Sequence, residues 1–122
     1  MNNEHIIHEL QQIILFQKKL EQIINNDEQN KPRQIPELID NLESTNMLTE
    51  KLVSGILSDN TTLDKAFLTT LNHELRTPLV PIKTYSKMLM QNKFGELNEQ
   101  QKERLDIIVT NTDLLQQKIT DL

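Results

Sequence analysis

A regular spacing of apolar residues in the second half of the chain limits what it can fold into. Seven residues recur there at alternating intervals of three and four: Leu68, Leu71, Leu75, Pro78, Ile82, Tyr85 and Leu89. This spacing aligns them along one face of an α-helix. Because the pattern continues through Pro78 and Pro81, we predict a single bent helix over roughly 62–92, although an internal proline usually ends a helix.

A second apolar stripe follows a short polar segment. It consists of Leu105, Ile108, Thr112, Leu115, Ile119 and Leu122. We expect Gly95 to cap the first helix at its C-terminus. Asn98, with Gln101 three residues later, is expected to cap the second helix at its N-terminus. Residues 61–122 are therefore predicted to form an antiparallel helical hairpin.

Residues 1–60 are predicted to form an N-terminal extension of two helices, over roughly 3–27 and 36–57. Their apolar stripes are Ile6, Leu10, Ile13, Leu20 and Ile24 in the first helix, and Leu38, Leu42, Leu52 and Ile56 in the second. A polar linker near 28–36 separates them, and Pro36 suits the first turn of the second helix. The sequence does not decide whether the two helices pack on the hairpin or extend from it.

The junction between the extension and the hairpin has two interpretations. The heptad phase of Leu42 and Ile56 is not continued from Leu68 onward, so either the helix breaks or one long helix changes face. Thr61 and Asp64 have the spacing of a capping box, which would start a new helix.

The composition favours an all-α fold. Two Gly and four Pro in 122 residues, with abundant Leu, Gln, Glu and Lys, are typical of helices. Since a lone hairpin leaves its apolar stripes poorly covered, two copies are expected to form a homodimeric four-helix bundle.

The absence of Cys excludes disulfides and thiolate metal sites and fits a cytoplasmic protein. A net charge of −5 gives no reason to expect nucleic acid, and no apolar run approaches the ~20 residues that span a membrane.

His73 is the residue with the clearest chemical potential. If Leu68, Leu75 and Ile82 occupy heptad position a, His73 falls at position f, opposite the core and exposed to solvent. A neutral imidazole offers a nucleophilic nitrogen. The adjacent Glu74 could hold the second ring N–H and raise the nucleophilicity of the ring.

The stretch from Phe67 to Ile82 resembles the phosphoacceptor helix of two-component sensor histidine kinases. The residues that agree with the family pattern are Phe67, His73, Glu74, Leu75, Arg76, Thr77, Pro78, Leu79 and Ile82. The resemblance covers 62–122 and implies a dimerisation and histidine-phosphotransfer domain of a kinase. Residues 1–60 carry no family signature and would serve signal relay or dimerisation.

The resemblance also implies roles for individual residues. His73 would receive the phosphoryl group, and Glu74 would assist in acid–base chemistry. Thr77, one turn after His73, would position the water that removes phosphate from a partner's aspartate, and Arg76 would contact phosphate. Pro78 and Pro81 remove backbone donors beside His73, so we expect a helix bend there and suggest that it moves in signalling.

A histidine kinase also needs an ATP-binding domain, and we expect none within these 122 residues. With only Gly55 and Gly95, there is no Gly-rich loop, and no Mg²⁺ site for nucleotide is evident. We therefore expect ATP and Mg²⁺ on a separate catalytic domain and a response-regulator receiver domain as the downstream partner. The chain would be a kinase fragment; the alternatives are a stand-alone phosphotransfer protein and a non-catalytic helical dimer that regulates a kinase or receiver.

Two other features have simpler interpretations. His5 and His8 have a spacing that could hold a metal weakly, but a solvated helix face is favoured because no third ligand is evident. Ile107 and Leu114 lie off the second stripe of the hairpin. We interpret them as widening the core, with a contact to a receiver domain as the alternative.

Overall fold

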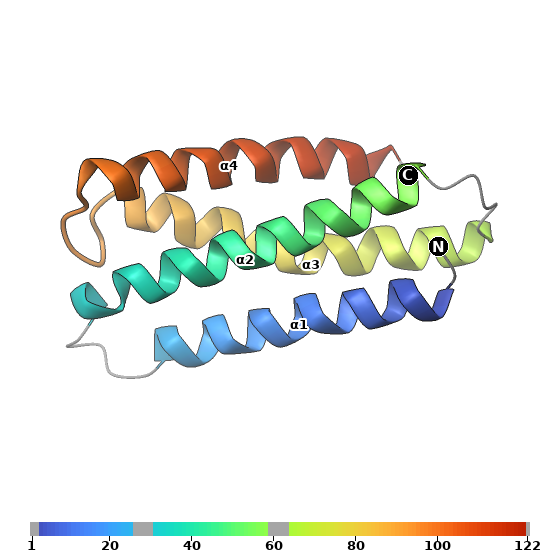
Figure 1. Cartoon of the computed structure of the whole chain (residues 1–122), viewed down its shortest axis with the longest axis horizontal. Helices are drawn as coiled ribbons and strands as arrows, with labels where there is room; N and C mark the ends of the chain where they lie inside the picture. Colours follow the sequence, from blue (N-terminus) through green and yellow to red (C-terminus); the bar gives the residue numbers. More distant parts are fainter. Residues whose placement is uncertain (1–2, 26–30, 59–63, 122) are drawn as a thin grey trace.

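A computed structural model describes residues 3–25, 31–58 and 64–121 of the chain (Figure 1). These residues form the helices α1 (Asn3–Asn25), α2 (Lys31–Ser58), α3 (Lys65–Met90) and α4 (Glu99–Thr120), with no strand among them. The all-α class and the α3–α4 hairpin are confirmed. Since α2 and α3 are separate antiparallel helices, the interpretation of a helix break between them is also confirmed (Figure 1).

The two hairpins pack on each other to form a bundle within one chain. α1 packs along α2, α3 packs along α4, and α2 contacts both α3 and α4. α2 and α4 run in the same direction, and α1 and α3 run in the opposite one (Figure 1). The N-terminal helices therefore fold onto the hairpin rather than extend from it. The homodimer stays a prediction.

One hydrophobic core joins the four helices. Its fully buried large side chains are Ile6, Ile13, Leu38, Ile39, Leu42, Leu52, Leu71, Leu75, Leu79, Ile82, Leu89 and Leu105. Burying one Leu or Ile side chain contributes roughly 1.5–3 kcal/mol. The predicted stripes of α3 and α4 thus supply much of the core, although Leu68 and Tyr85 are only half-buried and Leu122 lies outside the described residues.

The start of α2 differs from the sequence prediction. The helix begins at Lys31 rather than Pro36, and Pro36 lies inside it. The earlier start brings Ile35, which is 3% exposed, onto the buried face that also contains Leu38 and Leu42. Burial of Ile35 against the other helices is a tertiary effect that the polar composition near 28–36 concealed.

α3 is one continuous helix through both prolines, as the apolar spacing indicated. Its N-cap is Asp64, whose side chain accepts a hydrogen bond from the backbone N–H of Ala66 at 2.9 Å. Thr61, the other residue of the predicted capping box, lies outside the described residues. Asp64 thus satisfies a donor that the first turn of a helix leaves without an intrahelical partner.

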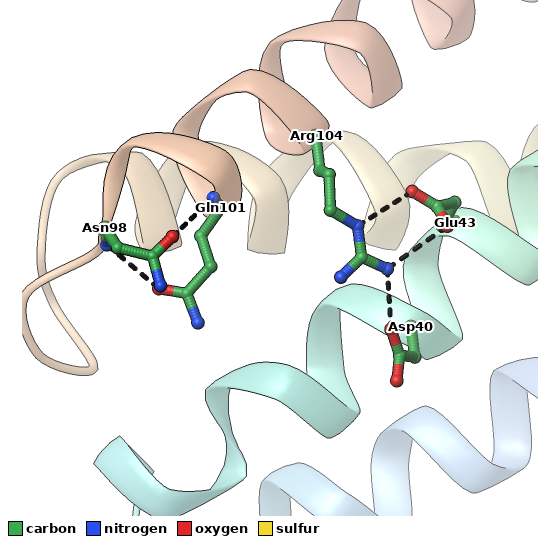
Figure 2. A network of polar contacts seen from close by, with 5 residues as sticks. All are labelled: Asp40, Glu43, Asn98, Gln101 and Arg104. Carbon is green, nitrogen blue, oxygen red and sulfur yellow. Dashed lines mark hydrogen bonds and ion pairs between the residues drawn. The ribbon is translucent and has the colours of Figure 1, made fainter.

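The predicted cap at the end of α3 is wrong, and the predicted cap at the start of α4 is confirmed. Gln91, not Gly95, is the C-cap of α3, and Asn92 follows with a φ of 60°. Asn tolerates this left-handed conformation, so Gly95 is not needed at the cap. Asn98 and Gln101 form the predicted capping box: each side chain accepts from the other residue's backbone N–H, at 2.8 and 3.0 Å (Figure 2).

The exposure of two α4 residues contradicts their interpretation as core. Ile107 is 61% exposed and Leu114 is 49% exposed. The core side of α4 is already filled by the stripe that includes Leu105, Ile108 and Leu115. The interpretation that Ile107 and Leu114 widen the core is therefore wrong.

Candidate functional site

His73 lies in the first half of α3, on its solvent-facing side. Leu71 and Leu75, two residues away on either side, are buried, whereas His73 is exposed. The prediction that heptad position f places the imidazole in solvent is confirmed. Within the described ranges the His73 side chain has no hydrogen-bond or ion-pair partner, so both ring nitrogens are accessible to a reactant.

A recess of about 350 Å³ opens beside the imidazole. It is lined by Lys65, Leu68, Thr69, Asn72, His73 and Arg76. Lys65 and Arg76 bring two cationic side chains to the same recess as the imidazole. An anionic group on the His73 ring would lie among ammonium, guanidinium and hydroxyl donors, which are typical ligands of phosphate oxygens.

The sequence interpretation missed Lys65, Thr69 and Asn72 as neighbours of His73. They precede His73 by eight, four and one residues, so Lys65 and Thr69 lie on the His73 side of α3. Asn72 also donates from Nδ2 to the backbone carbonyl of Ile119, which ties α3 to the last turns of α4. The helical spacing of Lys65, Thr69 and His73 was a signal that could have revealed this row.

The four residues that the family resemblance singled out do not all meet at one point. Arg76 lines the recess, and its Nη2 donates to Thr120 Oγ1 at 3.4 Å. Thr77 is exposed one turn after His73, and its hydroxyl donates to the His73 backbone carbonyl at 3.4 Å. Glu74 is half-buried and does not line the recess.

Two prolines alter the helix directly after His73. Pro78 is buried in the core and Pro81 is half-buried. Neither residue has a backbone N–H, so the carbonyls of Glu74 and Thr77 lack the usual donor four residues later. Both carbonyls lie within one turn of His73, where the backbone has fewer helical hydrogen bonds.

The two other histidines lie apart from this recess, on α1. His5 and His8 are exposed, and His5 Nε2 is 3.6 Å from Glu9 Oε1. No group of three potential metal ligands occurs among the described residues. No described helix is long and apolar enough to cross a membrane.

Comparison with known families identifies this half of the molecule. Residues 64–122 match the family model of the His Kinase A (phospho-acceptor) domain. The α3–α4 hairpin belongs to this family. No curated protein and no solved structure gives a significant match to the chain.

The match confirms the family that the residues around His73 indicated. The phosphoacceptor domain begins at Asp64, the N-cap of α3, and includes α4. α1 and α2 lie outside the matched residues. The family supports a phosphoacceptor and dimerisation role for the hairpin in two-component signalling, and the structure adds a second hairpin that packs on it.

Proposed function

We propose that His73 accepts a phosphoryl group from ATP held on a separate catalytic domain and passes it to an aspartate of a response-regulator receiver domain. The observation that carries this proposal is the exposed imidazole beside a recess with two cations, on the helix that matches the phosphoacceptor family. ATP and Mg²⁺ would bind the catalytic domain, not this chain. The reaction would take place in the cytoplasm.

The chemistry follows from the ring and its neighbours. A neutral His73 nitrogen attacks the γ-phosphorus, the N–P bond forms, and ADP leaves. Glu74 accepts the proton of the second ring nitrogen as the ring gains positive charge. Lys65 and Arg76 stabilise the oxygens of the transferred group. Since the imidazole is exposed, both a donor domain and a receiver domain can approach it.

Thr77 and the prolines belong to later steps of the proposed cycle. The Thr77 hydroxyl lies one turn from His73 and positions a water for removal of phosphate from the receiver aspartate. Pro78 and Pro81 leave the carbonyls of Glu74 and Thr77 without their helical donors, so a change in the bend of α3 there would alter how His73 and Thr77 lie relative to the rest of the bundle. This bend is the proposed moving part in switching between transfer and dephosphorylation.

A stand-alone phosphotransfer protein is the second candidate function. It is favoured by the packing of α1 and α2, which complete a four-helix bundle around the phosphoacceptor hairpin without a second copy. A third, non-catalytic function as a regulatory helical module would require that His73→Gln leave binding and regulation unchanged.

The proposal is tested by phosphorylation in trans. The full chain is incubated with labelled ATP, alone and with the ATP-binding domain of a related histidine kinase. Acid-labile, base-stable label is expected only in the mixture. It should be lost in His73→Gln and retained in the matched control His5→Gln/His8→Gln, which removes the other two histidines of the chain.

Adding a receiver domain to the labelled, purified chain should then move the label to the receiver. Label acquired from ATP alone would contradict the requirement for a separate catalytic domain. Equal label in wild type and His73→Gln, with a donor that phosphorylates its own substrate, would contradict the assignment of His73.

A further inference from the structure

α1 and α2 cover the apolar face that the phosphoacceptor hairpin would need for pairing with a second copy. In α3 and α4 this face consists of Leu71, Leu75, Ile82, Leu89, Leu105, Ile108, Leu115 and Ile119, each 2% exposed or less. A two-helix hairpin cannot cover such a face by itself; a four-helix bundle can. Here α2 packs against both α3 and α4, so the third and fourth helices come from the same chain.

We propose that the α1–α2 hairpin substitutes within the chain for a second copy of the phosphoacceptor hairpin, and that the chain exchanges between a closed monomer and an open dimer. In the open form, α1–α2 leaves α3–α4 and a second copy's α3–α4 hairpin takes its place. The inference rests on the dimerisation role of the family and not on whether His73 accepts a phosphoryl group.

A fork of charged hydrogen bonds fastens the two hairpins to each other. Arg104 of α4 donates from Nε and Nη2 to the two Glu43 oxygens of α2, both at 3.1 Å, and from Nη2 to Asp40 Oδ1 at 2.5 Å (Figure 2). Bidentate pairing of a guanidinium with a carboxylate fixes the orientation of the two groups as well as the distance between them. Hydrogen bonding to Glu43, and then to Asp40, raises the pKa of Arg104 above its ordinary value, so the guanidinium stays charged.

A second link lies inside the core. Asn46 of α2, which is 2% exposed, donates from Nδ2 to Thr112 Oγ1 of α4 at 2.9 Å. The Thr112 hydroxyl in turn donates to the carbonyl of Ile108 at 2.6 Å. A buried amide that loses its partner is costly, and a single buried Asn can fix the register of packed helices. The Asn46–Thr112 bond therefore favours one defined register between α2 and α4 in the closed form.

The closed and open forms exclude each other. Thr112 lies in the middle of the apolar stripe of α4 and is fully buried against α2. A second copy can reach this stripe only after the Asn46–Thr112 bond and the Arg104 fork have broken. Weakening the fork should then favour the dimer, because the apolar face of α3–α4 itself is unchanged.

The test is the mass of the full chain by sedimentation over a range of concentrations. Wild type is expected to have the monomer mass of 14.3 kDa at low concentration and to associate into a dimer as the concentration rises. Arg104→Glu places a third carboxylate beside Asp40 and Glu43 and should shift the mass to a dimer that dissociates on dilution. Arg104→Glu/Glu43→Arg restores an opposite-charge pair and should return the mass toward the monomer.

The matched control is Lys102→Glu, which makes the same charge change on α4. Lys102 is exposed and pairs with Glu99 of its own helix at 3.5 Å, so this variant should associate to the same extent as wild type. A wild type whose mass does not change with concentration, or an Arg104→Glu variant that is folded by circular dichroism and no more dimeric than wild type, would overturn the proposal.

A disulfide provides a second measurement that does not depend on destabilising the bundle. The chain has no cysteine, so Asn46→Cys/Thr112→Cys introduces one defined pair. Oxidation should join the two residues within one chain, and the oxidised protein should remain monomeric even when Arg104→Glu is added. A covalent dimer, or no disulfide in the folded protein, would contradict the closed monomer.

Discussion

The side chains around His73 divide the proposed transfer between charge stabilisation and proton transfer. Lys65 lines the recess two turns before His73 and provides one of its two cations. Lys65→Ala should lower the rate of His73 labelling about 10-fold, which corresponds to about 1.4 kcal/mol. The initial rate of label incorporation from a donor domain measures this effect. Lys87→Ala, an exposed lysine near the end of α3, is the control, and equal rates in both variants would contradict the role of Lys65.

Glu74 is expected to act on the proton rather than on the phosphate, because it is adjacent to His73 in the sequence and does not line the recess. Glu74→Gln keeps the size of the side chain and removes its basic oxygen. The labelling rate should fall by roughly 100-fold, a typical contribution of general acid–base assistance. Circular dichroism should show an unchanged helix content. If Glu74→Gln is labelled as fast as the exposed control Glu50→Gln, the assignment of Glu74 is wrong.

At the scale of the helix, the start of α4 depends on a reciprocal pair of side chains. Asn98→Ala removes an acceptor for the backbone N–H of Gln101 and should lower the free energy of unfolding by about 1 kcal/mol. Gln101→Ala removes the return bond, so the double variant should cost less than the two single variants together. Urea denaturation measures both, with Gln100→Ala, an exposed first-turn change, as the control. Full additivity would contradict a coupled capping box.

The helix ends show which boundaries a sequence can predict. The cap of α4 was predictable because Asn98 and Gln101 interact locally, three residues apart. The start of α2 was not, because it depends on burial of Ile35 against other helices. At the end of α3, Asn92 adopts the left-handed conformation, whereas Gly95 was expected to cap the helix. Both Asn and Gly occur in this conformation after a helix, so residue type alone does not decide which of the two lies at the helix end.

At the scale of the whole molecule, the shared core predicts that the two hairpins unfold together. Leu42 of α2 is fully buried in the core cluster that includes α3 and α4. Leu42→Ala should cost roughly 2–5 kcal/mol. The chain has one tyrosine and no tryptophan, so Tyr85 fluorescence reports on α3 alone, whereas circular dichroism reports on all helices.

In wild type and in Leu42→Ala the two signals should give the same denaturation midpoint, which is the expectation for a single cooperative unit. A Tyr85 midpoint that does not change with Leu42→Ala would show that the phosphoacceptor hairpin is stable without α2.

The docking of the two hairpins could not be predicted from the sequence. Heptad spacing identified which face of each helix is buried, and this was sufficient to place His73 in solvent. It did not identify the partner of that face, because a second copy and the chain's own α1–α2 hairpin satisfy the same apolar pattern. In the structure this face packs against α1–α2, and the Arg104–Glu43 contact between the two hairpins joins residues 61 positions apart. The recess cation Lys65 was missed for a simpler reason, since it precedes the stretch from Phe67 to Ile82 that contains the residues agreeing with the family pattern.

The assignment of His73 is tested most directly by locating the phosphoryl group on the wild-type chain. The chain is labelled by a donor catalytic domain, kept at alkaline pH, digested, and sequenced by mass spectrometry. We expect the phosphoryl group on the imidazole of His73, with His5 and His8 unmodified. A phosphoryl group on His5 or His8, or acid-stable label on a hydroxyl residue, would contradict this assignment.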